Sequence, residues 1–225
     1  MRLSFFESIA RAQGALLSGL ANTLTASLYA ILISSVLGIL IGIVLTYGHK
    51  VFRWPFRVYV DVIRGIPGLV IVFSVYYLID FWLRSWGFGL PPFVAGFVAL
   101  SVNATAHMAE TTRGALQTIP KGQIDAGKAI GMNFRKTLRH ILLPQAIVRM
   151  LPPWVNTITE IVKGSTLLAL IGVTELLLTT QQLIARNNNA LLYYAFAGFI
   201  YFLINFGIEK TGKLIEKKVS RGLVS

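Results

Sequence analysis

Five long apolar segments constrain this chain more than any other feature. They cover approximately residues 20–47, 58–79, 91–115, 152–178 and 190–209. A helix that crosses the hydrocarbon core of a bilayer needs about 20 mostly apolar residues. Of the 225 residues, 55% are hydrophobic and only 13% are charged, a balance outside that of soluble domains. The sequence therefore predicts an all-α integral membrane protein with about five transmembrane helices.

The basic residues predict the orientation of these helices. Lys50, Arg53 and Arg57 follow the first apolar segment, seven more lie from Arg113 to Arg149, and five lie from Lys210 to Arg221. The other ends of the segments hold only Arg2, Arg11, Arg84 and Arg186. Because short loops rich in Lys and Arg stay in the cytoplasm, we expect the amino terminus outside and the carboxyl terminus in the cytoplasm.

The composition argues against several classes of function. The formal net charge is +12, but the basic residues stand between apolar segments, which argues against nucleic-acid binding. The chain has no cysteine and therefore neither disulfides nor thiolate metal sites. The segment GIEKTGKL resembles a phosphate-binding P-loop, but it ends in Leu214 where Ser or Thr is required and follows no strand. We expect no catalytic residue, no metal site and no cofactor bound by this chain.

We interpret residues 1–225 as one domain, because the chain shows no repeat, linker or change of composition. In the amino-terminal segment, Glu7 and Arg11 interrupt the apolar residues, which favours an interfacial helix over a removed signal peptide. Gly38 and Gly42 are spaced for a close helix contact, either inside the chain or between subunits.

The most charged long stretch is GQIDAGKAIGMNFRKTLRHILLPQAI, residues 122–147, and we call residues 118–146 the basic loop. Pro120 suits the start of a short helix, Gly131 its left-handed end, and Asn133 the cap of a second helix. We expect Pro144 to end that second helix, whose apolar stripe contains Phe134, Leu138, Ile141 and Leu142. The loop fits either a surface attracted to anionic lipids or a rigid element gripped by a partner.

This loop resembles the so-called EAA loop of permease subunits in bacterial ABC importers. Three further segments resemble the polar amino-acid branch of those permeases: VIRGIPGLVIVF at 62–73, AHMAETTRGALQTIPKGQ at 106–123 and LPPWVNTITEIVKGSTLLALIGVTEL at 151–176. The resemblance covers nearly the whole chain in register. It implies a multi-pass permease of the bacterial plasma (inner) membrane that moves a polar amino acid into the cytoplasm.

The resemblance also implies partners. Two ABC ATPase subunits would bind ATP and Mg and would dock on the basic loop. A second permease, identical or homologous, would complete the pathway, and an external binding protein would deliver the amino acid. The chain itself would be a non-catalytic subunit surrounded by membrane lipids.

The family motif assigns coupling residues within the basic loop. Where the family usually has Glu-Ala-Ala, this chain has Asp125, Ala126 and Gly127. Asp125 keeps a carboxylate that can interact with the helix dipole or with a basic residue of the ATPase. Gly127 in place of alanine costs about 1 kcal/mol of helix propensity, which predicts an irregular docking helix. The other coupling candidates are Gly131, Arg135 and Pro144.

Charged and polar residues inside the apolar segments form the candidate substrate path, namely Arg64, Asn103, His107, Glu160 and Lys163. A charge at membrane depth costs about 2.5–3.5 kcal/mol on insertion scales. Glu160 and Lys163 can neutralise each other, or Glu160 can face the path and attract a substrate ammonium or guanidinium. Asn103 can bind a carboxylate or a neighbouring helix, whereas His107 is more typical of a packed imidazole.

Arg64 lies in the sequence RGIPG, where the family usually has Arg-Gly-Thr-Pro. We expect it at the cytoplasmic end of the second span, with Pro67 in the first turn of the helix. There the guanidinium can reach the interface or pair with Glu110 or Asp61.

Two other classes of function remain open. An ion-coupled secondary amino-acid transporter would show inverted repeats, broken helices and usually more spans. A non-transporting membrane scaffold could use the basic loop for lipid binding alone.

Overall fold

The chain folds into helices, as the sequence predicts. The computed structural model describes residues 5–221, and no strand occurs in that range. The long helices are α1 (Phe5–Tyr47), α2 (Lys50–Gly65), α5 (Pro92–Gln117), α8 (Leu143–Gly164) and α10 (Ala190–Arg221). The short ones are α3 (Gly68–Ser74), α4 (Asp80–Arg84), α6 (Gly122–Ala129), α7 (Phe134–Thr137) and α9 (Leu176–Asn187). Between them lie the π-helical turns η1 (Val75–Ile79) and η2 (Leu138–Leu142) and the 3₁₀ helix η3 (Ser165–Ile171).

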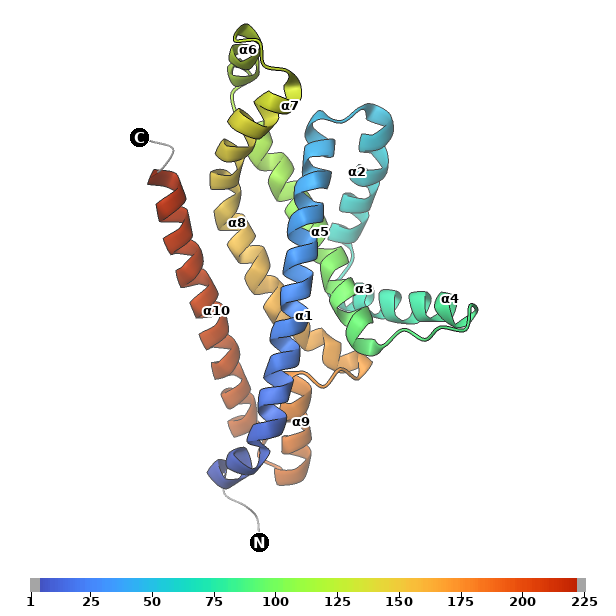
Figure 1. The fold of residues 1–225 in the computed structure, drawn as a ribbon. Helices are drawn as coiled ribbons and strands as arrows, with labels where there is room; N and C mark the ends of the chain where they lie inside the picture. Colours follow the sequence, from blue (N-terminus) through green and yellow to red (C-terminus); the bar gives the residue numbers. More distant parts are fainter. Residues whose placement is uncertain (1–4, 222–225) are drawn as a thin grey trace.

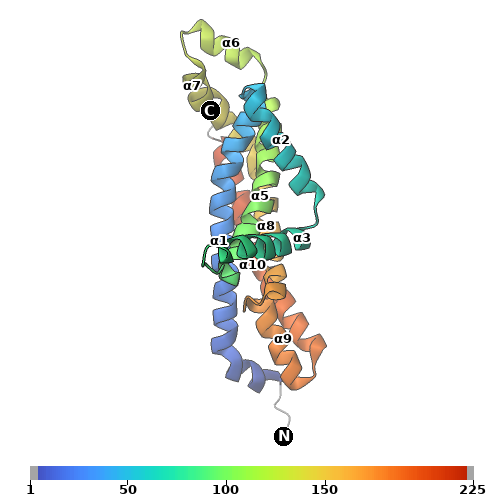
Figure 2. The ribbon, with the colours of Figure 1, turned by 90° about the vertical axis from the view of Figure 1, so that its right-hand side faces the viewer.

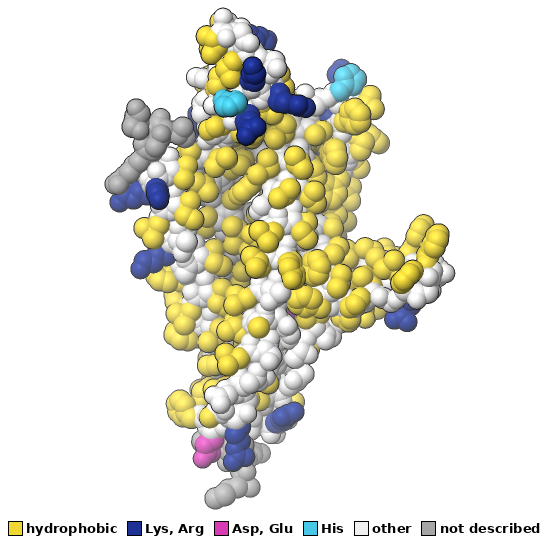
Figure 3. Space-filling view, in the orientation of Figure 1, with side chains coloured by type: hydrophobic (Ala, Val, Ile, Leu, Met, Phe, Trp, Pro, Cys, Tyr) yellow, Lys and Arg dark blue, Asp and Glu magenta, His cyan; other side chains and the backbone are white. Residues whose placement is uncertain are grey.

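The helices form an elongated bundle. In Figure 1, α1, α5, α8 and α10 run along its long axis, and α6 and α7 form one tip, which we call the loop end. The first turns of α1 and the helix α9 lie at the opposite end. Figure 3 shows hydrophobic side chains over most of the visible face, whereas Lys and Arg gather mainly at the loop end and along α10. A wide apolar belt between charged ends is the surface that a bilayer requires.

Five membrane crossings fit this fold, although two of them are bent. α1, α5 and residues Ala190–Val219 are each long and apolar enough to cross a membrane. Two helix pairs qualify only together: Lys50–Gly65 with Gly68–Arg84, bent by 114°, and Phe134–Ile171 with Leu176–Asn187, bent by 53°. The prediction of an all-helical membrane protein with about five spans is therefore confirmed.

The second predicted span, residues 58–79, is not a straight helix. The helix is interrupted at Ile66 and Pro67, and the arm of α3, η1 and α4 projects sideways from the bundle (Figures 1 and 2). The residue before a proline avoids the helical region, and Ile66 accordingly adopts φ −98° and ψ 134°. Arg64 thus lies in the last turn of α2, and the prediction that RGIPG opens the second span is wrong, because these residues interrupt the bent span in its middle.

The fourth span begins earlier than predicted. Helical structure runs without interruption from Phe134 to Ile171, so the prediction that Pro144 ends a helix is wrong. Pro144 is tolerated because it stands in the first turn of α8, directly after the widened turn η2, where the Leu143 N–H bonds to the Leu138 carbonyl. The basic loop is therefore joined rigidly to the fourth span.

The amino-terminal segment is not a separate helix. It forms the first turns of α1, which bend near their beginning (Figures 1 and 2). Leu16 is buried with Tyr193, and Phe5 and Ile9 pack against this cluster. The expected interfacial helix is therefore part of the bundle, since Phe5 and Ile9 pack against residues of α9 and α10, whereas Phe6 stays exposed.

Two close contacts fix the bundle. A Cβ atom at Gly38 would lie 2.5 Å from Met108 Cβ, and one at Gly42 would lie 2.5 Å from Thr112 Cβ, so both glycines are required where α1 meets α5. These glycines thus serve packing inside the chain. Near the opposite end, the buried Glu175 carboxylate accepts hydrogen bonds from the backbone N–H groups of Leu177 and Leu178 and from the Tyr201 hydroxyl at 2.8, 2.6 and 2.7 Å.

Candidate functional site

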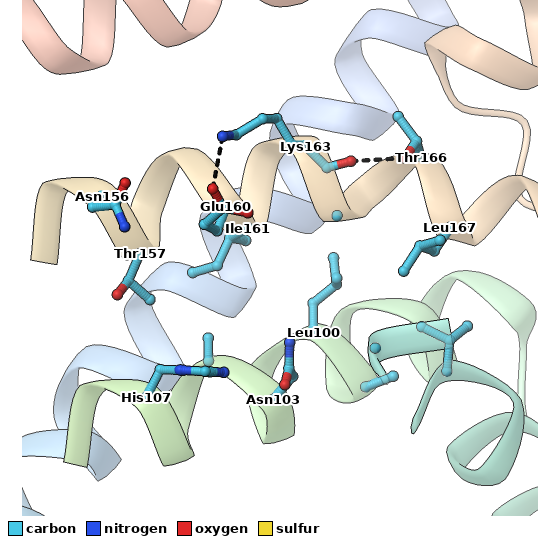
Figure 4. Close-up of a pocket in the computed structure, with 15 residues that line it drawn as sticks. Leu100, Asn103, His107, Asn156, Thr157, Glu160, Ile161, Lys163, Thr166 and Leu167 are labelled. Atoms are coloured by element: carbon cyan, nitrogen blue, oxygen red, sulfur yellow. Dashed lines mark hydrogen bonds and ion pairs between the residues drawn. The ribbon is translucent and has the colours of Figure 1, made fainter. Parts of the chain in front are cut away.

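A cavity of about 610 Å³ opens in the middle of the bundle, where α5 faces α8 and η3 (Figure 4). Its apolar wall includes Val72, Leu100, Ile161 and Leu167. Its polar lining consists of Asn103, His107, Asn156, Thr157, Glu160, Lys163 and Thr166. A largely apolar pocket with a few convergent polar groups is typical of a small-molecule site.

Glu160 and Lys163 lie on the α8 side of the cavity. The Lys163 ammonium donates to Glu160 Oε1 at 2.7 Å, and the two side chains are 53% and 62% exposed respectively. The two uses expected from the sequence are thus compatible, because the side chains pair and also line the cavity (Figure 4). An ion pair that is open to the cavity offers one negative and one positive group, which can bind an ammonium and a carboxylate respectively.

Asn103 and His107 lie opposite, one helical turn apart on α5 (Figure 4). The carboxamide and the imidazole can each donate and accept hydrogen bonds. The structure therefore brings together four of the five predicted path residues. Together with Glu160 and Lys163, they surround a volume that can hold a small zwitterion.

Arg64 is the predicted path residue that does not line this cavity. Of the two possibilities for Arg64, the ion pair with Asp61 or Glu110 does not form within residues 5–221, where both carboxylates bind Arg57 at 2.8 and 3.2 Å. Glu110 also binds Arg113. Of these pairs, only that of Arg57 with Glu110 joins α2 to α5.

Sequence reasoning missed Asn156, Thr157 and Thr166 as lining residues. Asn156 precedes Glu160 by one helical turn, so the helical period that placed Glu160 on the path could have found it. Thr166 had no such signal, because it lies in η3, where the helix tightens after Gly164.

The basic loop forms the helix-turn-helix that its residues predict. α6 ends at Ala129, Gly131 follows at φ 77°, and the Asn133 side chain accepts from the Lys136 N–H at 2.9 Å. Asp125 lies in the first half of α6, 3.8 Å from Lys128 Nζ, and both side chains are largely exposed. Ala126 and Arg135 are exposed as well.

The expectation of an irregular docking helix is wrong. α6 runs unbroken through Gly127, which is buried against Thr137. A Cβ atom there would lie 2.7 Å from Thr137 Oγ1 and 3.0 Å from Cγ2. Glycine stands in this position because α6 approaches α7 too closely for alanine.

Apolar contacts hold the loop to the bundle. Leu142 is fully buried with Leu116 and Met150, and Leu138 and Ile141 pack against them. At the base, Arg149 Nη1 donates to the carbonyl and hydroxyl oxygens of Thr118, both at 2.6 Å. Ile130 at the tip stays 74% exposed, and the sequence analysis did not single it out.

Comparison with known proteins identifies the family. Residues 34–221 match the family described as "Binding-protein-dependent transport system inner membrane component". The chain belongs to this family. It is 33% identical to the L-cystine transport system permease protein TcyB of Bacillus subtilis over 90% of this chain and 86% of that protein. It is 32% identical to the glutamine transport system permease protein GlnP of Escherichia coli over 91% of this chain and 92% of that protein.

A solved structure shares the fold. The crystal structure of an amino acid ABC transporter with histidines matches with a TM-score of 0.84 and 28% identity over 97% of this chain and 100% of that chain. The prediction of an ABC-importer permease, a multi-pass protein of the inner membrane, is therefore confirmed.

Proposed function

We propose that this chain is the membrane permease of an ATP-driven importer that carries a polar amino acid, bound as a zwitterion in the cavity of about 610 Å³. The observation that carries the proposal is the open ion pair of Glu160 and Lys163 in that cavity. The Glu160 carboxylate would attract the substrate ammonium, and Lys163 with Asn103 would hold its carboxylate. His107 would bind a polar side chain.

The names of the relatives support this substrate class. TcyB carries cystine, GlnP carries glutamine, and the solved relative is described with histidines. Glu160 would also attract a cationic side chain of the substrate, because a carboxylate forms charge-assisted hydrogen bonds with ammonium and guanidinium groups, and Lys163 would offset part of this attraction.

The coupling mechanism follows from the rigid basic loop. Asp125, Ala126 and Arg135 at the exposed tip would contact a cytoplasmic ATPase, and Gly131 would set the shape of the loop. Because the helix continues from Phe134 through Pro144 into α8, a push at Arg135 would reach Glu160 along one continuous helix, and α6 would act on that helix through the contact of Gly127 with Thr137.

The partners follow from the same proposal. Two ATPase subunits would hold ATP and Mg, two permeases would form the pathway, and an external binding protein would dock where α1 begins. The amino terminus would then lie outside and the carboxyl terminus in the cytoplasm. The arm of α3 and α4 exposes Phe81, Trp82 and Trp86, which fits a contact with the second permease. The chain itself would be non-catalytic.

The test uses proteoliposomes that contain the permease, its ATPase and its binding protein. ATP-driven uptake of L-histidine, L-arginine and L-glutamine is measured for wild type, Glu160→Gln and Glu160→Asp. We expect Glu160→Gln to raise the half-maximal substrate concentration by up to about fivefold, the range for losing one partly exposed charge contact. Glu160→Asp, which keeps the charge, should lie closer to wild type.

Three results would contradict the proposal. An unchanged half-maximal concentration in Glu160→Gln removes Glu160 from the site. Uptake that survives ATP depletion but collapses with a protonophore indicates an ion-coupled transporter. Failure of the ATPase to copurify, together with no uptake, leaves only the lipid-binding scaffold.

A further inference from the structure

A second, smaller cleft lies beside the cavity on its loop-end side. It has a volume of about 180 Å³ and lies between α8 and α10, where Pro152 and Asn156 face Glu209, Lys213 and Glu216. We call it the α8–α10 cleft. Asn156 lines both the cavity and this cleft, so the two spaces adjoin at one side chain.

The helix directions place the cleft between the cavity and the loop end. α8 runs away from the loop end, so Asn156 lies nearer to that end than Glu160 and Lys163. α10 runs toward the loop end, and its residues Glu209 to Glu216 lie in the half nearer to it. A solute leaving the cavity past Asn156 in this direction enters the cleft.

A close helix contact forms one edge of the cleft. A Cβ atom at Gly212 would overlap Val155 Cγ2, so α10 touches α8 at this glycine. Glu209, Lys213 and Glu216 stand on one side of that contact, and the apolar Leu203, Ile204 and Ile208 stand on the other. The charged face of α10 therefore turns to the same side of α8 as Asn156.

The charged groups of the cleft are free to bind a solute. Glu209 and Lys213 are four residues apart and Lys213 and Glu216 three apart, spacings at which helical ion pairs form. Within residues 5–221, no ion pair or hydrogen bond joins these side chains, whereas Glu160 and Lys163 do pair at the same spacing. The two carboxylates can bind the ammonium of a zwitterion and the ammonium of Lys213 can bind its carboxylate. Because negative groups outnumber positive ones, the cleft also favours a cationic solute.

We propose that the α8–α10 cleft is a second, weaker amino-acid site, which receives a zwitterionic or cationic amino acid as it leaves the cavity. The inference rests on the proposed function. The volume of the cleft is about six times the roughly 30 Å³ of one water, which is room for a small solute. The charged groups are open to water, so their attraction for a ligand is small, as release requires.

Equilibrium binding tests the proposal. Tritiated L-histidine, L-arginine and L-glutamine are bound separately to the nucleotide-free complex of the permease with its ATPase. The wild type should have two binding sites for the transported amino acid per permease chain, a tight class of site and a weak class of site. The double variant Glu209→Gln/Glu216→Gln should weaken only the weak class, by about threefold to tenfold for two exposed charge contacts. Glu160→Gln should weaken only the tight class.

The matched control is Lys210→Gln/Lys217→Gln, which neutralises two charges of the same helix outside the cleft. It should leave both classes unchanged. A single class in a wild-type complex that transports, or a weak class unaffected by Glu209→Gln/Glu216→Gln, overturns this inference alone. A wild-type complex that neither transports nor binds any of the three amino acids overturns the proposed function as well.

Discussion

Replacing Gly127 by alanine should weaken the basic loop, although alanine is the residue that the family usually has there. Alanine gains about 1 kcal/mol of helix propensity over glycine. This gain is opposed by a steric clash, because the new Cβ would lie 2.7 Å from Thr137 Oγ1 and 3.0 Å from Thr137 Cγ2. Rotation of the threonine about χ1 can move only one of these two branches away at a time, so the other branch still lies against the new methyl group. Thr137 is only 1% exposed, and its hydroxyl donates to the Asn133 carbonyl at 3.2 Å.

The magnitude follows from these opposing effects. Overpacking a well-packed site costs about 1–3 kcal/mol, so the net destabilisation of the loop should be between about 0 and 2 kcal/mol. Hydrogen–deuterium exchange of residues 122–143 in the purified complex measures this change directly. Faster exchange should be accompanied by a lower ratio of amino acid transported to ATP hydrolysed.

The double variant Gly127→Ala/Thr137→Ala separates contact from propensity. The nearest remaining Thr137 atom, Cβ, would lie 3.4 Å from the new methyl group, an ordinary contact. The double variant should therefore exchange more slowly than Gly127→Ala alone, with Thr137→Ala as the control. If Gly127→Ala by itself slows exchange below the wild-type rate, the close approach of α6 and α7 is refuted.

Two further changes test the loop and the opposite end. Gly131→Val forces a β-branched residue to φ 77°, which costs about 1–2 kcal/mol or more. In this variant ATP hydrolysis should proceed without matching uptake, while membrane insertion stays normal. Wild-type coupling of hydrolysis to uptake would contradict this expectation. Glu175→Ala removes the acceptor of three buried hydrogen bonds and should destabilise the permease by about 3 kcal/mol or more. Glu175→Gln keeps an acceptor, so its melting temperature should fall less, and equal losses in both variants would refute the role of these bonds.

The sequence by itself determined the features that depend on local chemistry. Long apolar segments must be helices that cross the membrane, because lipid offers no partner to backbone groups. The turn at Gly131 and the cap at Asn133 were predictable since each depends on the conformation of a few consecutive residues. The meeting of Glu160, Lys163, Asn103 and His107 around one cavity was also predictable, because charged and polar groups at membrane depth must face a polar space.

Only the tertiary structure decided features that depend on a neighbour distant in sequence. Gly127 looks unfavourable in an isolated helix, and the reason for it is Thr137 on another helix. Arg57 takes the carboxylates that Arg64 could have paired with, because Arg57 stands one turn before Asp61 and its guanidinium also reaches Glu110 on α5. Pro144 does not end its helix because the π turn before it leaves room for the ring. Propensity and spacing describe a residue within its own segment, whereas packing between helices determines which close contacts are possible.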